Sequence, residues 1–163
     1  MRGLFNYRLT NFYCFILISF LVSFGYYLQY FHSLPPCPLC VLQRIIFVIL
    51  ALIFLLASMI QFKRAGRITT AFLTSLFSFL GLAAAARQVW LQHLPASQVP
   101  ACIPDLQTLF SLFPFKKAVG LVFRGGVDCA TVHWRWLGLS IPEWSLIFFI
   151  GLAIVSIWQL LRK

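Results

Sequence analysis

Four long apolar segments constrain the fold of this chain more than any other feature of its sequence. They run from Leu9 to Phe31, from Val41 to Phe62, from Ile68 to Leu91 and from Trp144 to Leu161. A helix needs about 20 apolar residues to cross the hydrocarbon core of a bilayer, so each segment is long enough to span it once. The sequence therefore predicts an all-α polytopic membrane protein, a bundle of four transmembrane helices in a single membrane domain over residues 1–163.

The composition excludes several classes of protein. The 163 residues are 61% hydrophobic and only 10% charged, which rules out a soluble globular domain. Only three carboxylates are present, too few for a hard-metal site or for the acid pair of a glycosidase. The net charge of +10 comes from basic residues between apolar segments, where they orient membrane helices. The expected partner is the lipid bilayer, and no nucleic acid is expected.

The distribution of the basic residues predicts the orientation of the spans. None lies in the loop of residues 32–40 and four lie in the loop of residues 94–143. Seven lie at the chain ends and between the second and third segments: Arg2, Arg8, Lys63, Arg64, Arg67, Arg162 and Lys163. Because basic segments remain on the cytoplasmic side, both termini are predicted to be cytoplasmic and both loops to lie on the outer, periplasmic side.

Two further segments carry structural predictions. Leu106 to Phe123 is rich in bulky apolar residues and lysines but is broken by Pro114. We expect this segment to lie along the membrane surface, and the alternative is a short hairpin into the membrane. In the third span, Gly81 and Ala83 to Ala86 form a stretch of small residues that lets helix backbones approach closely.

The five cysteines divide into two groups. Cys14 lies in the inner half of the first span, about 25 Å of helix from its outer end, and is expected to be a packing residue. The other four lie in or beside the outer loops, where an oxidising compartment favours two disulfides in any of three pairings: Cys37, Cys40, Cys102 and Cys129. A zinc site is the alternative, although the second pair is not a CxxC unit. Covalent haem attachment is excluded, because Val41 stands where a histidine is required.

The CxxC unit Pro36-Cys37-Pro38-Leu39-Cys40 lies where the second span begins. Its disulfide would close too small a ring to constrain an unfolded chain much, so a purely structural role explains it poorly. If Pro38 is the first helical residue, Cys37 is the N-cap and Cys40 lies in the first turn. Both thiolates then face unpaired backbone N–H groups at the positive end of the helix dipole. This placement predicts a redox-active pair.

Three further side chains are candidates for a cofactor site. Arg44 shares a helix face with both cysteines of the CxxC unit and lies about 6 Å deeper than Cys40. An arginine there suits an electron acceptor that becomes negative on reduction and enters from lipid, as a quinone does; the alternative is an arginine that reaches the interface. Arg87 and His93, near the outer end of the third span, are weaker candidates.

The chain resembles, over nearly its whole length, the disulfide-bond formation protein B (DsbB) family of inner-membrane thiol:quinone oxidoreductases. Several motifs carry the resemblance: the CxxC unit followed by Gln43-Arg44; the run Ala86-Arg87-Gln88-Val89-Trp90-Leu91-Gln92-His93; Val99-Pro100-Ala101-Cys102; and Asp128-Cys129 followed by Trp136-Leu137-Gly138-Leu139-Ser140-Ile141-Pro142-Glu143-Trp144. The resemblance implies an enzyme of a bacterial inner membrane with ubiquinone or menaquinone as its cofactor and no metal.

The resemblance also implies roles for the cysteines. Cys37 and Cys40 would form the disulfide next to the quinone, and Cys102 and Cys129 a second, periplasmic disulfide. A reduced DsbA-like dithiol would attack Cys102, Cys129 would exchange onto Cys37, and the Cys40 thiolate would engage the quinone beside Arg44, passing electrons to the membrane quinone pool. Some members carry an acidic residue before this arginine; Gln43 stands here and removes one proton donor.

Two other functions remain open from the sequence. The first is an enzyme that imports reducing equivalents, which would need reactive cysteines within reach of the cytoplasmic side, where only Cys14 is available. The second is an assembly factor stapled by disulfides, which leaves the CxxC unit beside Arg44 unexplained.

Overall fold

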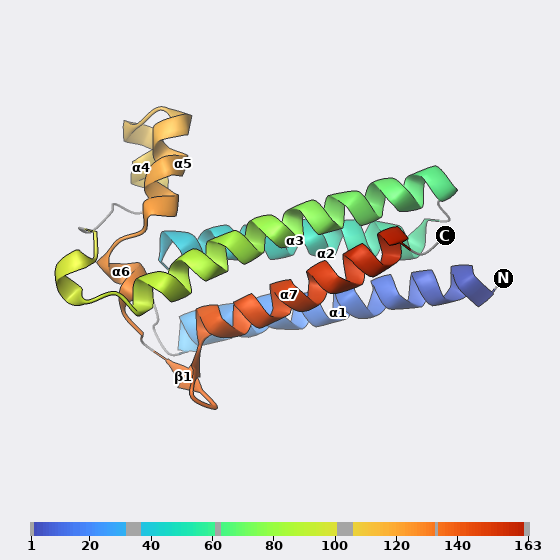
Figure 1. Ribbon diagram of the computed structural model, residues 1–163, viewed down its shortest axis with the longest axis horizontal. Coiled ribbons are helices and arrows are strands. Elements are labelled where there is room, and N and C mark those ends of the chain that lie inside the picture. The colour runs from blue at the N-terminus through green and yellow to red at the C-terminus, as the bar shows by residue number, and fades with distance from the viewer. Residues whose placement is uncertain (1, 32–36, 61–62, 101–105, 133, 162–163) are drawn as a thin grey trace.

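The computed structural model describes residues 2–31, 37–60, 63–100, 106–132 and 134–161. In this part of the chain four long helices run side by side: α1 (Arg2–Phe31), α2 (Pro38–Met59), α3 (Arg64–Gln92) and α7 (Ile141–Leu161). Each is long and apolar enough to cross a membrane, which confirms the predicted four-span, all-α architecture. The start of α1 and the end of α7 lie at the same end of the bundle (Figure 1).

The helices extend beyond most of the predicted segments. The third helix begins at Arg64, four residues before Ile68, because a helix can extend beyond the apolar stretch that crosses the membrane. The fourth helix begins at Ile141 rather than Trp144. A side chain of its first turn bonds to the residue before the helix. There Glu143 accepts hydrogen bonds from the backbone N–H of Ser140 at 2.6 Å and from its hydroxyl at 2.8 Å. The bond from the backbone N–H of Ser140 to Glu143 is one half of a capping box, in which a Glu side chain bonds back to the residue before the helix.

The long connection between α3 and α7 folds into short elements at one end of the bundle. They are η1 (Ala96–Gln98), α4 (Leu106–Leu112), α5 (Phe115–Arg124), α6 (Val127–Ala130), β1 (Arg135–Trp136) and β2 (Leu139–Ser140). Pro114 is the N-cap of α5 and separates it from α4, as its place in the sequence predicts. Both helices run across the long axis of the bundle, an orientation that suits a membrane surface (Figure 1). The hairpin of β1 and β2 is not predicted from the sequence.

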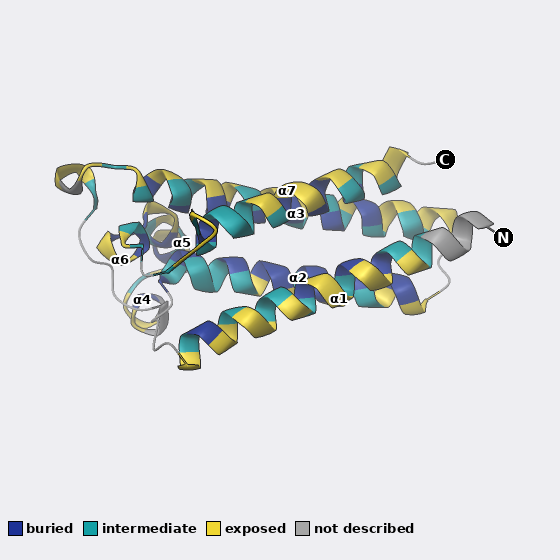
Figure 2. Ribbon diagram, turned by 90° about the horizontal axis from the view of Figure 1, so that it is seen from below, coloured by how far each residue is buried: buried dark blue, intermediate teal, exposed yellow. Residues whose placement is uncertain are grey.

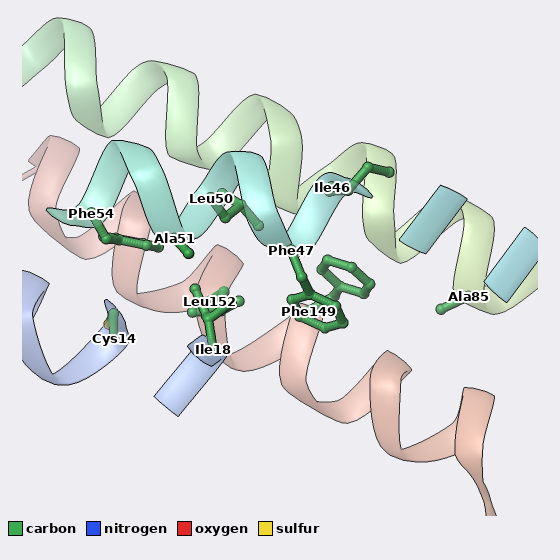
Figure 3. Close-up of a cluster of buried hydrophobic side chains, with 10 residues drawn as sticks. All are labelled: Cys14, Ile18, Ile46, Phe47, Leu50, Ala51, Phe54, Ala85, Phe149 and Leu152. Carbon is green, nitrogen blue, oxygen red and sulfur yellow. The ribbon is translucent and has the colours of Figure 1, made fainter. Parts of the chain in front are cut away.

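The helices pack in the order α1, α2, α3, α7, with α1 and α7 in only sparse contact within the described residues. Buried residues alternate with exposed ones along the four long helices, as expected of helices that each turn one face into a bundle (Figure 2). A central cluster fills the bundle (Figure 3), in which the rings of Phe47 and Phe149 stack with centroids 4.1 Å apart. Cys14 is buried in this cluster, consistent with the predicted packing role.

Polar side chains join the helices at the end of the bundle where the chain begins. The hydroxyls of Tyr7 and Thr70 lie 2.7 Å apart and link α1 to α3. Arg8 donates to the carbonyl of Ser58 in α2 at 2.7 Å. Gln159 of α7 donates to Asn11 of α1 at 3.0 Å, so α1 and α7 are held together at this end.

Small residues let α3 approach α7 closely, as predicted. Gly81, Ala84 and Ala85 are buried, whereas Ala83 and Ala86 point outward. A Cβ atom on Gly81 would lie only 2.2 Å from Cε1 of Phe149 in α7, so no side chain fits there without movement of the ring or the helix.

We expect Gly81→Ala to destabilise the protein by about 1–3 kcal/mol, the usual cost of overpacking a close contact. Gly151→Ala is the matched control, because no atom lies within 4 Å of the Cβ it would add. Thermal unfolding in detergent measures both. A parent-like midpoint for Gly81→Ala would contradict the close contact with Phe149.

Candidate active site

The start of α2 presents the two cysteines of the CxxC unit. Cys37 is the N-cap and Pro38 follows in the first turn, which confirms the predicted register. The backbone N–H of Cys40 donates to the sulfur of Cys37 at 3.4 Å, and the two sulfurs lie 3.0 Å apart. Both sulfurs therefore lie at the N-terminal end of a 22-residue helix, where the helix dipole favours negative charge.

Cys129 lies against this pair. It comes from α6, is 1% exposed, and packs in a cluster with Cys37, Leu39 and Leu91. A hydrogen bond from the Cys37 thiol lowers the pKa of Cys129 to about 6, with the backbone N–H groups of Leu39 and Gly126 acting in the same direction against the effect of burial. The same contact raises the pKa of Cys37, because its thiol donates to the sulfurs of Cys129 and Cys40. When both cysteines are reduced, Cys129 is thus favoured as the thiolate and Cys37 as the protonated thiol.

A glycine makes this approach possible. Gly125 ends α5 with φ 68° and ψ 169°, a conformation almost restricted to glycine. A Cβ atom added to Gly125 would lie 2.4 Å from Cδ1 of Leu91 and 3.3 Å from Cδ1 of Leu39. The chain can therefore turn from α5 into α6 and bring Cys129 to α2 only with a glycine at this position. Cys102, the remaining predicted site cysteine, lies outside the described residues.

A cavity of about 520 Å³ adjoins the CxxC sulfurs between α1 and α7. Its walls are mostly apolar, with aromatic rings from α1, α2, α7 and the segment before β1: Phe20, Phe24, Phe47, Trp134, Trp144 and Phe148. A few polar side chains join them, among them Arg44, Gln29 and Gln88. This is the size and composition of a site for a largely apolar small molecule.

Arg44 lines this cavity and is held by α1. Its guanidinium donates to the side-chain oxygen of Gln29 and to the carbonyl of Gly25 at 3.1 Å, and it lies 5.1 Å from the ring centre of Tyr26. These two hydrogen bonds use two of the five guanidinium donors. The predicted placement of Arg44 on the face of the reactive cysteines agrees with its position in the cavity wall.

Arg87 and His93 do not line the cavity. Arg87 donates to the carbonyls of Phe123 and Arg124 at 3.2 and 3.1 Å, where it caps the end of α5. Its guanidinium also lies 4.2 Å from the ring centre of Trp90. His93 ends α3, is exposed, and its Nδ1 lies 2.8 Å from the carbonyl of Val89. The structure thus separates both residues from Arg44, with which the sequence groups them as cofactor candidates.

Two glutamines complete the site. The sequence analysis noted Gln43 only as the residue before Arg44, and it gave Gln88 no role. Gln88 of α3 donates to the sulfur of Cys40 at 3.0 Å and to that of Cys37 at 3.3 Å. Gln43 of α2 donates to the side-chain oxygen of Gln88 at 2.7 Å. The available signal was position: Gln88 lies four residues after Ala84 and seven after Gly81, on the same buried face of α3.

The fold and the site together define a class, a multi-pass membrane oxidoreductase with a cluster of cysteine thiols at one end of a helix bundle. Comparison with known proteins agrees. The family model described as Disulfide bond formation protein DsbB matches residues 7–159. The chain belongs to this family, whose members form disulfide bonds in bacterial membranes.

Relatives match over nearly their whole length. The chain is 45% identical to Disulfide bond formation protein B of Hahella chejuensis over 96% of this chain and 94% of that protein. It is 43% identical to the protein of the same name from Stutzerimonas stutzeri over 89% of both chains. With that of Saccharophagus degradans the identity is 42%, over 97% and 95% of the two chains.

The hydrogen bond from Cys37 predicts a pH dependence for Cys129. In the reduced protein we expect Cys129 to ionise near pH 6, so it is mostly thiolate at neutral pH and is protonated as the pH falls below 6. Cys37→Ala removes the largest cause and is expected to raise this pKa. Ultraviolet absorbance of the thiolate during a pH titration measures it, with Cys129→Ser as the blank. A parent transition near pH 9 would contradict the contact.

The turn at Gly125 predicts a second result. Gly125→Ala is expected to displace Cys129 and slow formation of a Cys37–Cys129 disulfide roughly 10- to 100-fold, since small misplacements of reacting groups cost that much. Gly138→Ala is the matched control: its φ of 84° is equally unfavourable, but no atom lies within 4 Å of its added Cβ. Acid quenching, alkylation and peptide mapping follow the reaction. Equal rates in the two variants would overturn the positional role of Gly125.

Proposed function

We propose that this protein is a thiol:quinone oxidoreductase that reoxidises a periplasmic DsbA-like dithiol oxidase and passes two electrons to membrane quinone, either ubiquinone or menaquinone. One observation carries the proposal. The sulfurs of Cys37 and Cys40 lie between Cys129, on the side of the outer loop, and a largely apolar cavity that contains Arg44. The pair is therefore within reach of a thiol on one side and of a lipid-soluble acceptor on the other.

The exchange chemistry combines the positions of the described sulfurs with the Cys102–Cys129 pairing that the family resemblance implies, since Cys102 lies outside the described residues. A partner thiolate attacks Cys102 in a Cys102–Cys129 disulfide, which leaves the electron pair of the broken bond on Cys129. The Cys129 thiolate then attacks Cys37 of a Cys37–Cys40 disulfide, so a Cys37–Cys129 bond forms and the electron pair of the broken bond remains on Cys40. The backbone N–H groups of Leu39 and Gly126 support the second step, because they favour the attacking Cys129 thiolate and do not depend on a Cys37 thiol, which is absent while Cys37 is in the disulfide.

The residues of the cavity fit a quinone. Its apolar walls match a hydrophobic ring and the start of an isoprenoid tail, and the guanidinium of Arg44 supplies a donor for a ring oxygen that gains negative charge. A bound quinone supplies the capacity to take up two electrons and two protons. Gln43 can donate a hydrogen bond but no proton, so protons must reach the site by another route.

The opening between α1 and α7 suits an acceptor that arrives from lipid. These two helices are joined by Gln159 and Asn11 at the inner end, yet both contribute to the walls of the cavity at the outer end. A molecule dissolved in the bilayer can reach the cavity between them without crossing water.

We further propose that the protein lies in the bacterial inner membrane with both termini in the cytoplasm. Basic side chains at the end of the bundle where α1 begins support this orientation, among them Arg8, Lys63, Arg64 and Arg67. The cysteines of α2 and α6 then face the oxidising periplasm. Among the described residues, the core cluster that buries Cys14 contains no other cysteine, so an importer of reducing equivalents would lack a partner thiol there.

Replacement of Arg44 by lysine tests the acceptor site. If Arg44 donates to a quinone oxygen, Arg44→Lys should lower turnover or raise the apparent quinone KM, within the roughly 10²–10³-fold range for loss of such a donor. Single-turnover oxidation of a reduced DsbA-like partner, without added quinone, should be unaffected. Steady-state oxidation over a quinone titration shows the difference.

Arg87→Lys is the control, because it makes the same change at an arginine that caps α5 and lies outside the cavity. It is expected to keep the quinone KM of the parent. A parent-like Arg44→Lys at every quinone concentration, or equal slowing of both assays, would remove the quinone role of Arg44.

A further inference from the structure

The contact between Gln88 and the two sulfurs has the geometry of a specific donor site. Gln88 is 3% exposed and its amide nitrogen lies 3.0 Å from the sulfur of Cys40 and 3.3 Å from that of Cys37. A polar side chain buried at this depth in a membrane helix is costly unless its hydrogen bonds are satisfied. Here the nitrogen is satisfied by the sulfurs alone among the described residues.

Gln43 fixes which end of the Gln88 amide faces the sulfurs. Its nitrogen donates to the oxygen of Gln88 at 2.7 Å, and Gln43 is itself only 4% exposed. The oxygen of Gln88 is thereby turned toward α2, and its two N–H donors are left to face the cysteines. An amide held in this way requires no reorientation when charge develops on a sulfur.

Both sulfurs accept from Gln88, but its contact with Cys40 is the shorter of the two, and Cys37 has a backbone donor in addition. The N-cap hydrogen bond from the backbone N–H of Cys40 goes to Cys37, and the shorter side-chain hydrogen bond from Gln88 goes to Cys40. Arg44 directs its described hydrogen bonds to Gln29 and Gly25 of α1. Gln88 is therefore the side-chain donor placed to act on Cys40.

We propose that Gln88 is a catalytic residue that stabilises the thiolate released on Cys40 when the Cys37–Cys40 disulfide is opened. The inference rests on the exchange step of the proposed function. In that step the Cys129 thiolate bonds to Cys37, the Cys37–Cys40 bond breaks, and Cys40 takes the electron pair without a proton. The amide N–H of Gln88 donates to this leaving sulfur, and the amide itself is neither protonated nor consumed.

The test measures how readily the Cys37–Cys40 disulfide is reduced. The full-length protein in detergent is equilibrated with reduced and oxidised dithiothreitol, quenched with acid and alkylated, and the Cys37–Cys40 peptide is quantified by mass spectrometry. A hydrogen bond to a thiolate stabilises the reduced form, so Gln88→Met, of similar size but without a donor, should lower the equilibrium constant for reduction roughly 10- to 100-fold. The difference should shrink at acid pH, where Cys40 is protonated.

Two further variants make the test specific. Gln92→Met is the matched control, because Gln92 lies one turn further along α3, also lines the cavity, and accepts from Ser140 at 2.8 Å instead of contacting a sulfur. It should keep the constant of the parent. Gln43→Met leaves Gln88 in place but removes its orienting donor, and a smaller decrease is expected.

The proposal is overturned if Gln88→Met keeps the parent constant, or if Gln92→Met lowers it equally. A decrease that does not vary with pH would also overturn it, since packing alone would act on both protonation states. Where Gln88→Met does not fold, an unchanged constant in Gln43→Met overturns the proposal. The dithiothreitol equilibrium contains neither the partner nor quinone. If the parent fails to oxidise a DsbA-like partner in a separate assay, that failure rejects the proposed function and leaves the result for Gln88 unchanged.

Discussion

The close packing of α3 between α2 and α7 determines the geometry of the whole site. It depends on buried small residues, above all Gly81, where any side chain would collide with Phe149. Because lipid tails are as apolar as the helix surfaces, the hydrophobic effect does not drive helices together in a membrane. Close contacts between helices are instead stabilised by van der Waals packing and hydrogen bonds. The approach carries Gln88 to the start of α2, where it meets Cys37 and Cys40.

The two ends of the bundle use polar side chains in different ways. At the end where α1 begins, the hydrogen bond from Gln159 to Asn11 joins α1 to α7. At the other end, polar groups instead surround the CxxC sulfurs and the cavity, whose walls come from both α1 and α7. The bundle is thus joined by side-chain hydrogen bonds at one end and contains the cavity at the other.

Much of this architecture follows from local sequence. Length and hydropathy were sufficient for the four spans, Pro38 for the start of α2, and Pro114 for the break between α4 and α5. Each of these depends on neighbours within a few residues. The orientation of the bundle in the membrane and the surface position of α4 and α5 stay predictions.

The contacts between distant segments could not be predicted in this way. Arg87 and His93 lie at the expected position along α3, near the end that adjoins the site. The rotation of the helix turns Arg87 toward the end of α5, and neither side chain lines the cavity. The roles of Gln88 and Gln43 required the relative rotation of two helices, which no single-helix pattern contains. The approach of Cys129 depended on the turn at Gly125, and Cys102 lies outside the described residues.

The central claim is that electrons pass from outer thiols through the CxxC pair to a quinone in the membrane. The most direct measurement mixes the purified protein with excess reduced DsbA-like partner and a soluble quinone analogue, and counts quinol formed against partner disulfide formed. The account predicts one quinol for each disulfide over many turnovers, and no quinol when Cys40 is replaced by alanine. Sustained oxidation of the partner with quinone unchanged, or undiminished quinol formation in Cys40→Ala, would contradict it.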